Sequence, residues 1–319
     1  MKLLLATQQG QVTAQRAEDI WRVTSRALDG KELTCIAGVN GTFYAGTNNG
    51  IFRSPDRGET WTEWDSGLAV RHTRWIAGQG ERVFVGTEPA SIFVKGDHES
   101  NWRECAEVAA LRDRHRWFLP YSSEAGCIRG FAFNGSRVYA AAEVGGALRS
   151  DDEGASWRMC AGSSGSPSLS ASPEPDIHPD VHSIEVHPSS PDLVYAPTGG
   201  GFFRSLDGGQ TWKLSYRCYV RAAWIDPKDP DHILLGPADG VSRNGRIEES
   251  RDGGKSWQKA SHGLDVPWRG HMVERFYQLG DELLAVLSNG QLLAAPMQTL
   301  EWAQILAEVP GINAIAGMA

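Results

Sequence analysis

Four aspartates of the chain stand in one short sequence pattern, and a carboxylate in such a setting can do chemistry. Glycoside hydrolysis, for example, uses pairs of carboxylates. The pattern is S-x-D-x-G-x-x-W, and it surrounds Asp56, Asp152, Asp207 and Asp252. Its recurrence favours a structural role, because Ser and Asp side chains bond nearby backbone N–H groups and glycine permits positive φ. We therefore predict that these four aspartates stabilise turns.

A second group of chemically capable residues stands at the start of short apolar segments such as TRWIAG and RAAWI. Arginine binds a carboxylate, phosphate or sulfate through two points of its rigid guanidinium group. Histidine and glutamate can exchange protons as acid and base. The group consists of Arg74, Arg129, His182, Arg221 and Glu274.

The elements that must position these residues form an internal repeat. Tryptophans mark seven units of roughly 40 to 55 residues, which is the period of propeller blades. Each unit contains four short apolar segments separated by turns, as expected for a four-stranded antiparallel blade. The marking residues are Trp21, Trp61, Trp102, Trp157, Trp212, Trp257 and Trp302.

The two ends of the chain complement each other. INAIAG (312–317) matches the first strand of a unit, whereas KLLLAT, QVTAQR and IWRVT match the second, third and fourth strands. We predict an all-β fold: a single seven-bladed β-propeller over residues 1–319, with blade one shared between 1–26 and 310–319. Pairing of the C-terminal strand with the N-terminal blade removes an exposed sheet edge.

The four motifs resemble those of the Asp-box (BNR) repeat β-propellers. That family includes sialidases, other glycosidases, the sortilin ectodomain and a photosystem II assembly factor. The resemblance implies that the Asp turns join strands three and four, on the face opposite the usual ligand face. It specifies the repeat and not the function, because one fold hosts many functions.

On the other face, the starts of the first strands should surround the mouth of the central channel. The aligned positions are Asn313, Thr34, Arg74, Arg129, His182, Arg221 and Glu274. Buried charge is costly unless it is paired or used. Three arginines aimed at one spot would make an anion site. Alternatively, Glu274 and Glu185 neutralise the arginines in a structural network.

Long connections add residues on this face. Residues 103–128, 158–181 and 266–272 are longer than ordinary propeller loops, and such loops are usually functional. Aromatic and charged side chains there could cover a sugar ring, although solvated surface loops are the alternative. The candidates are Trp117, His178, Trp268, Arg269 and His271.

No metal or other cofactor is expected. His178 and His182 are four residues apart, a spacing that shares a face only on a helix, whereas HPDVH is a loop entering a strand. Five cysteines without a C-x-x-C pair argue against a zinc site or a disulfide framework, and they favour a reducing cytoplasmic location.

The composition also limits the partners. A net charge of −8 argues against a nucleic-acid binder. The apolar run in MKLLLATQQG is too short for a signal peptide. The chain also lacks a run of about 18 apolar residues, so we expect no membrane association.

Two functions remain open. In the first, the propeller binds an anionic small molecule or acidic carbohydrate at the channel mouth. It would then act as a ligand-binding protein, or as a glycosidase-like hydrolase or lyase with Glu274 and His182 as acid and base. Sialidases use an arginine triad that Arg74, Arg129 and Arg221 resemble, but the FRIP-type motif is absent here. In the second, a non-catalytic scaffold grips an acidic protein partner.

Overall fold

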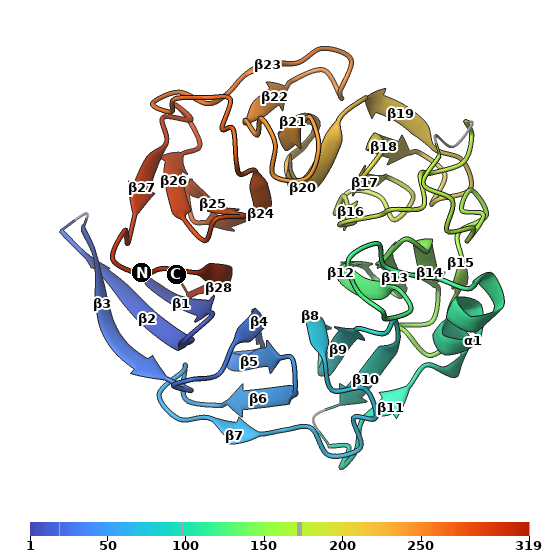
Figure 1. The fold of residues 1–319 in the computed structure, drawn as a ribbon, viewed down its shortest axis with the longest axis horizontal. Coiled ribbons are helices and arrows are strands. Elements are labelled where there is room, and N and C mark those ends of the chain that lie inside the picture. Colours follow the sequence, from blue (N-terminus) through green and yellow to red (C-terminus); the bar gives the residue numbers. More distant parts are fainter. Residues whose placement is uncertain (19, 97, 171–173, 319) are drawn as a thin grey trace.

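The computed structural model describes residues 1–18, 20–96, 98–170 and 174–318. Seven four-stranded antiparallel sheets stand around a central channel (Figure 1). The predicted seven-bladed β-propeller is therefore confirmed.

The first strand of each blade lines the channel. These strands are β4 (Leu33–Val39), β8 (Thr73–Gln79), β12 (Cys127–Asn134), β16 (Glu185–Val186), β20 (Tyr219–Asp226), β24 (Val273–Leu279) and β28 (Ile312–Met318). The second strands are β1 (Lys2–Thr7), β5 (Thr42–Thr47), β9 (Arg82–Thr87), β13 (Arg137–Glu143), β17 (Val194–Thr198), β21 (Asp229–Ala238) and β25 (Glu282–Leu287).

The third and fourth strands form the outside of the ring. The third strands are β2 (Gly10–Ala17), β6 (Gly50–Ser54), β10 (Ile92–Gly96), β14 (Gly146–Ser150), β18 (Gly201–Ser205), β22 (Glu248–Ser250) and β26 (Leu292–Pro296). The fourth are β3 (Ile20–Ala27), β7 (Thr62–Glu63), β11 (Arg103–Glu104), β15 (Arg158–Met159), β19 (Lys213–Tyr216), β23 (Gln258–Lys259) and β27 (Ala303–Ile305).

Second strands are buried on both faces, because each blade packs between two neighbours. In β1, β9 and β25 every residue after the first is buried. This explains why these strands appear in the sequence as continuous apolar runs and not as an apolar–polar alternation. The core is therefore divided into clusters that lie between blades.

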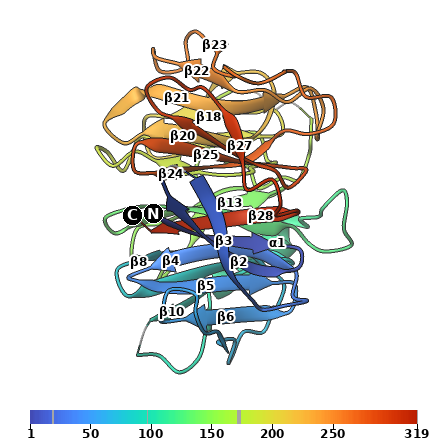
Figure 2. The ribbon, with the colours of Figure 1, turned by 90° about the vertical axis from the view of Figure 1, so that its left-hand side faces the viewer.

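The ring closes as predicted from the two chain ends. β28 pairs with β1 in antiparallel register, with Leu4 opposite Ala316 and Lys2 opposite Met318. The two termini lie side by side in both views (Figures 1 and 2). Blade one is thus completed by the last strand of the chain, which covers the inner edge of β1.

The four predicted aspartates lie in the turns between strands three and four. In each turn the Ser hydroxyl donates to the Asp carboxylate and accepts from a glycine N–H, as Ser205 does from Gly209 at 2.8 Å. Asp207 also accepts from the N–H and hydroxyl of Thr211, at 2.9 and 2.7 Å. The carboxylates of Asp56, Asp152 and Asp252 are held by the same set of bonds. These carboxylates stabilise turns, because their acceptor sites are occupied.

Strand direction separates this face from the channel mouth. Because successive strands are antiparallel, the turns between strands three and four lie at the face where the first strands end. The opposite face carries the starts of the first strands and the connections between blades. One such connection contains α1 (Ala106–His115). No helix in the described ranges is long and apolar enough to cross a membrane.

Candidate functional site

A β-bulge lies near the start of nearly every first strand. The pairing register shifts by one residue so that one residue of the inner strand has no partner of its own on the second strand. In five blades this extra residue is a predicted rim residue, and in a sixth the shift spans Arg221 and Ala222. The five are Asn313, Thr34, Arg74, Arg129 and Glu274.

The bulges explain why charge concentrates at these positions. A bulge redirects the side chain of the extra residue and increases local twist, and bulges are common next to functional sites. In blade five, the Val181–Thr198 bridge and the Glu185–Tyr195 pair are also offset by one residue. His182 lies in this offset segment. The bulges therefore explain the direction of the rim side chains, which strand alternation alone does not explain.

A polar cavity of 360 Å³ opens at the channel mouth. Five of the seven aligned rim residues line it: Thr34, Arg74, Arg129, Glu274 and Asn313. Arg221 does not, and it lines a second cavity of 290 Å³ deeper in the channel. The fold thus brings most of the predicted rim together at two connected depths, since Glu274 and Arg275 line both cavities.

Most of the channel arginines are already paired with carboxylates. Arg129 donates to Glu143 at 2.9 Å and lies 3.6 Å from Glu274. Arg221 donates to the other oxygen of Glu274, and Arg74 lies 3.3 Å from Glu88. Because Glu274 bridges two arginines, this part of the rim forms a neutralised network.

The network also fixes the protonation of its buried acid. Burial alone would raise the pKa of Glu143, but the Arg129 guanidinium outweighs it and holds that pKa well below its usual range. Tyr121 and Cys127 also donate to the same carboxylate oxygen, at 2.9 and 3.2 Å. Glu143 is therefore a charged structural acid at neutral pH.

Arg275 is a cation that the sequence analysis missed. Its guanidinium lies 4.0 Å from the ring centroid of Trp75, and it reaches the Thr34 carbonyl at 3.5 Å. Across the described ranges, no carboxylate forms an ion pair with it. Burial lowers the pKa of Arg275 to about 10, so the group still carries its charge at neutral pH.

Arg275 escaped the sequence analysis for a structural reason. Alternation along β24 places neighbouring residues on opposite faces. The bulge at Glu274 breaks that alternation, so that Glu274 and Arg275 both line the mouth cavity. The one available signal was the pair of adjacent charges at the start of an inner strand.

Glu185 does not neutralise the arginines, which the sequence left as one alternative. It lines the deeper cavity with Trp75, Phe276 and Tyr277. No ion pair joins it to an arginine within the part of the chain that the structure describes. The Glu185 side chain is exposed to the channel, but protein surrounds it. This surrounding protein limits hydration of the carboxylate and raises the pKa of Glu185 to about 8.

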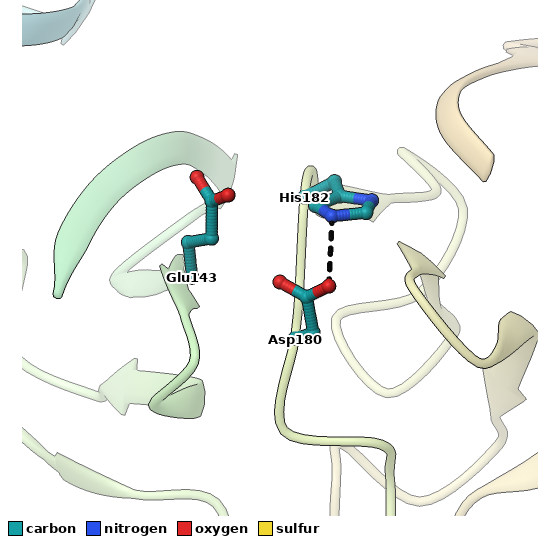
Figure 3. Close-up of side chains that lie close together, drawn as sticks. All are labelled: Glu143, Asp180 and His182. Carbon is teal, nitrogen blue, oxygen red and sulfur yellow. Dashed lines mark ion pairs between the residues drawn. The ribbon is translucent and has the colours of Figure 1, made fainter. Parts of the chain in front are cut away.

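His182 lies behind the rim. It is buried, and its Nδ1 lies 2.7 Å from the Val220 carbonyl. Its Nε2 lies 3.1 Å from Asp180 and 3.3 Å from the Tyr219 hydroxyl. In Figure 3, Glu143 lies across from His182 and Asp180. Glu143, Asp180 and His182 are the described residues whose ligand atoms lie close enough together to hold a metal ion.

The long connections place their predicted residues apart from the mouth cavity. Trp117 is buried and donates to the Gly165 carbonyl at 3.0 Å. His178 lines a separate cavity of 320 Å³ with Leu169 and Arg217. The rings of Trp268 and His271 stack with centroids 5.1 Å apart, and Arg269 is exposed. Within the connection 158–181, residues 171–173 lie outside the described residues.

A sialidase-like nucleophile is not assembled here. Sialidases use a tyrosine–glutamate pair as the nucleophile. Here Arg221 lies between Tyr219 and Glu274 and donates to both. Burial raises the pKa of Tyr219, which opposes its ionisation. Among the described residues, Tyr219 and Glu274 therefore do not form such a nucleophile pair.

Comparison with known proteins agrees with the repeat and the fold. The family model of the BNR/Asp-box repeat matches residues 203–214. No match to this chain was found among the curated proteins. A structure of YCF48 bound to D1 peptide is 14% identical, with 92% of this chain and 87% of that chain covered and a TM-score of 0.63.

Other solved structures with the same fold include a second YCF48 and a xyloglucanase. YCF48 from Cyanidioschyzon merolae is 15% identical, with 93% and 91% coverage and a TM-score of 0.65. The GH74 xyloglucanase from Xanthomonas campestris is 15% identical, but only 45% of that chain is covered, against 87% of this one, with a TM-score of 0.61. Identities this low establish the fold alone. The chain is thus a seven-bladed β-propeller that carries the BNR/Asp-box repeat.

Proposed function

We propose that the propeller binds a small anionic molecule, such as an acidic carbohydrate, at the channel mouth, with Arg275 as its main anchor. The observation that carries this proposal is the charge balance of the channel. Arg129 and Arg221 have carboxylate partners, whereas Arg275 is partly buried with an aromatic ring and a backbone carbonyl as neighbours. A partly buried guanidinium without a counter-ion loses some of its hydration, and an anionic ligand would offset that cost.

The cavity has the size and lining that such a ligand needs. A volume of 360 Å³ lies within the usual range of small-molecule sites, roughly 300 to 1,000 Å³. Arg74 adds a second cation, because its pairing with Glu88 is a single 3.3 Å contact that leaves the guanidinium partly exposed. The lining also includes two carboxylates, Glu32 and Glu274. Its neutral polar residues are Gln8, Thr34, Ser288, Asn289 and Asn313.

Binding is favoured over catalysis at this site. A general acid or base needs a carboxyl or imidazole that exchanges its proton near neutral pH. Glu143 is held as an anion, and each carboxylate oxygen of Glu274 faces an arginine. Glu185, whose pKa is raised to about 8 by burial, lines the deeper cavity and not the mouth cavity. His182, the other predicted acid or base, is fully buried and lines neither channel cavity.

A protein partner is the second candidate, and exposed aromatic side chains favour it. Phe118 and Tyr121 are 42% and 55% exposed on the connection that leads into β12 at the mouth face. The similar structure of YCF48 is bound to a peptide. A peptide that ends in a free carboxylate would place its terminal anion at Arg275 and its apolar side chains on these rings.

Isothermal titration calorimetry of the wild type and Arg275→Met tests the proposal. The probes are N-acetylneuraminate, glucuronate, citrate and inorganic phosphate, together with an acidic peptide that has a free or an amidated C-terminus. We expect at least one probe to bind the wild type, and Arg275→Met to weaken it roughly tenfold or more. This follows because hydrogen bonds to charged groups contribute about 1.5 to 3 kcal/mol.

Arg158→Met is the matched control, since Arg158 pairs with Asp151 on an outer strand. Binding that persists in Arg275→Met would refute the proposed anchor. Binding of the free peptide alone, lost on amidation, would select the protein partner over the small molecule. Arg275→Met should fold about as stably as the wild type, because a partly buried charge is replaced by an apolar side chain of similar length.

A further inference from the structure

Glu143, Asp180 and His182 bring three potential metal ligands together beside the channel (Figure 3). One ligand atom of each lies within 4.8 Å of those of the other two. Their side chains are 4%, 15% and 0% exposed. Glu143 ends β13 in blade four, whereas Asp180 and His182 lie on the connection that enters blade five. The cluster therefore joins two neighbouring blades.

The imidazole of His182 is oriented as a ligand would be. Its Nδ1 faces the Val220 carbonyl at 2.7 Å, so Nδ1 carries a hydrogen. Nε2 is then directed toward the carboxylates. A histidine that binds a metal usually donates its other ring N–H to a carbonyl or carboxylate, which fixes the tautomer and the ring orientation.

The cluster holds more acceptors than its hydrogens can satisfy. His182 Nε2 faces both Asp180 Oδ2 and the Tyr219 hydroxyl. The Tyr219 oxygen accepts from Arg221 at 3.1 and 3.2 Å, so it has one hydrogen to give. Asp180 Oδ1 is a buried atom that no described residue bonds. Buried polar atoms of this kind require an explanation, and a bound cation is one.

Glu143 keeps one oxygen open toward the cluster. Arg129, Tyr121 and Cys127 all donate to its Oε2. No donor among the described residues bonds its Oε1. The three donors orient the carboxylate, while the charge of Arg129 is shared with Glu274 on its other side.

Asp180 is held in place by its backbone neighbours. The Gly199 N–H donates to the Asp180 carbonyl at 2.9 Å, and a Cβ added to Gly199 would lie only 2.2 Å from Asp180 Oδ2. The Asp180 N–H donates to His178 Nδ1 at 3.2 Å. His178 therefore positions Asp180 and is not itself part of the cluster.

We propose that Glu143, Asp180 and His182 bind one divalent transition metal ion, with Zn²⁺ and Mn²⁺ as the best matches. One imidazole nitrogen and two carboxylates suit these ions, and two carboxylates balance the charge. Zinc ligands lie about 2.0 to 2.2 Å from the metal, so the three side chains close around the ion when it binds. The ion ties β13 to the connection that enters blade five.

Calorimetric titration of the full chain with Zn²⁺ and with Mn²⁺ tests this site. We expect one ion per chain in the wild type, and loss of that stoichiometric binding in Asp180→Asn and His182→Gln. His187→Gln is the matched control, because His187 is a buried histidine of the same blade whose ring bonds Ser189 and the Asp226 carbonyl. It should bind the metal as the wild type does.

Two outcomes would overturn the proposal. One is binding that survives both Asp180→Asn and His182→Gln. The other is binding lost equally in His178→Gln and His182→Gln but kept in Asp180→Asn, which would assign the ion to a histidine pair. Anomalous diffraction from wild-type crystals soaked in MnCl₂ or ZnCl₂ decides the case without variants. A peak in contact with all three residues supports the site, and a soaked crystal without one refutes it.

Discussion

Asp207 and Arg275 are both charged, and the protein holds their charges in different ways. Asp207 receives hydrogen bonds from Ser205, Gln210 and Thr211, so its acceptor sites are filled within its own turn. Arg275 lies on Trp75 and keeps donors that no carboxylate among the described residues uses. At the residue scale, the satisfied charge stabilises the fold and the unsatisfied one is available for recognition.

Asp207→Ala should lower the free energy of unfolding by roughly 1 to 2 kcal/mol. Hydrogen bonds to charged groups contribute about 1.5 to 3 kcal/mol, and water replaces part of that in an exposed turn. Urea denaturation measures the change. Leu206→Ala is the control, because the neighbouring Leu206 is 70% exposed. Equal stability of the two variants would contradict the structural role of the carboxylate.

Stability should fall in acid as these carboxylates take up protons. Their hydrogen bonds lower the pKa of Asp152, chiefly through Ser156, to about 2, and they also lower the pKa of Asp207 against the opposing effect of burial. A lowered folded-state pKa stabilises the protein above the unfolded value of about 3.9, and this stabilisation is lost as pH falls through the folded value. Unfolding curves measured from about pH 5 down to about pH 2 should show a smaller decline in stability for Asp207→Ala than for the wild type.

At the scale of elements, adjacent blades contact each other through glycines of the second strands. A Cβ added to Gly86 on β9 would lie 2.5 Å from the Ile128 carbonyl oxygen of the next blade. The same kind of position on β5 is Gly46, where an added Cβ would meet Thr73 at 2.5 Å. These close contacts bring β8 and β12 near enough to their neighbours for the bulged residues to share one mouth.

Gly86→Ala should therefore destabilise the propeller by roughly 1 to 3 kcal/mol, the usual cost of overpacking, because the carbonyl can move only with its strand. The matched control is Gly270→Ala. An added Cβ there meets no atom within 4 Å. Thermal unfolding of both variants measures the difference, and a Gly86→Ala protein as stable as Gly270→Ala would show that the blades can separate without cost.

At the scale of the whole molecule, stability depends on closure of the ring. β28 supplies the inner strand of blade one, and its Ile312 and Ile315 are buried against β1 and the neighbouring blades. Removing it exposes the inner edge of β1, which then pairs with other chains or frays. The two ends of the sequence are therefore one structural unit.

A chain that stops after Val309 should lose about 3 to 6 kcal/mol from these two isoleucines alone, since full burial of each side chain contributes about 1.5 to 3 kcal/mol. We expect a lower Tm and aggregation, both reversed by adding a peptide of residues 310–318. Differential scanning calorimetry with and without the peptide measures this. An unchanged Tm in the truncated chain would show that three strands suffice for blade one.

The sequence alone determined the fold and the role of the Asp motifs. Asp56, Asp152, Asp207 and Asp252 are local turn residues, and their partners lie within four positions along the chain. Seven tryptophan-marked units and complementary chain ends were enough to predict the number of blades and the closure. Such features follow from short-range patterns that repeat, and repetition makes them detectable.

Tertiary structure decided which rim charges are free. Alignment placed Arg74, Arg129, Arg221 and Glu274 at the channel, but pairing depends on distances between side chains of different blades. Arg275 faces the cavity because a bulge at Glu274 interrupts strand alternation, and periodicity does not predict a bulge. The cluster of Glu143, Asp180 and His182 also joins two blades across about forty residues, and only the closed ring brings its ligand atoms together.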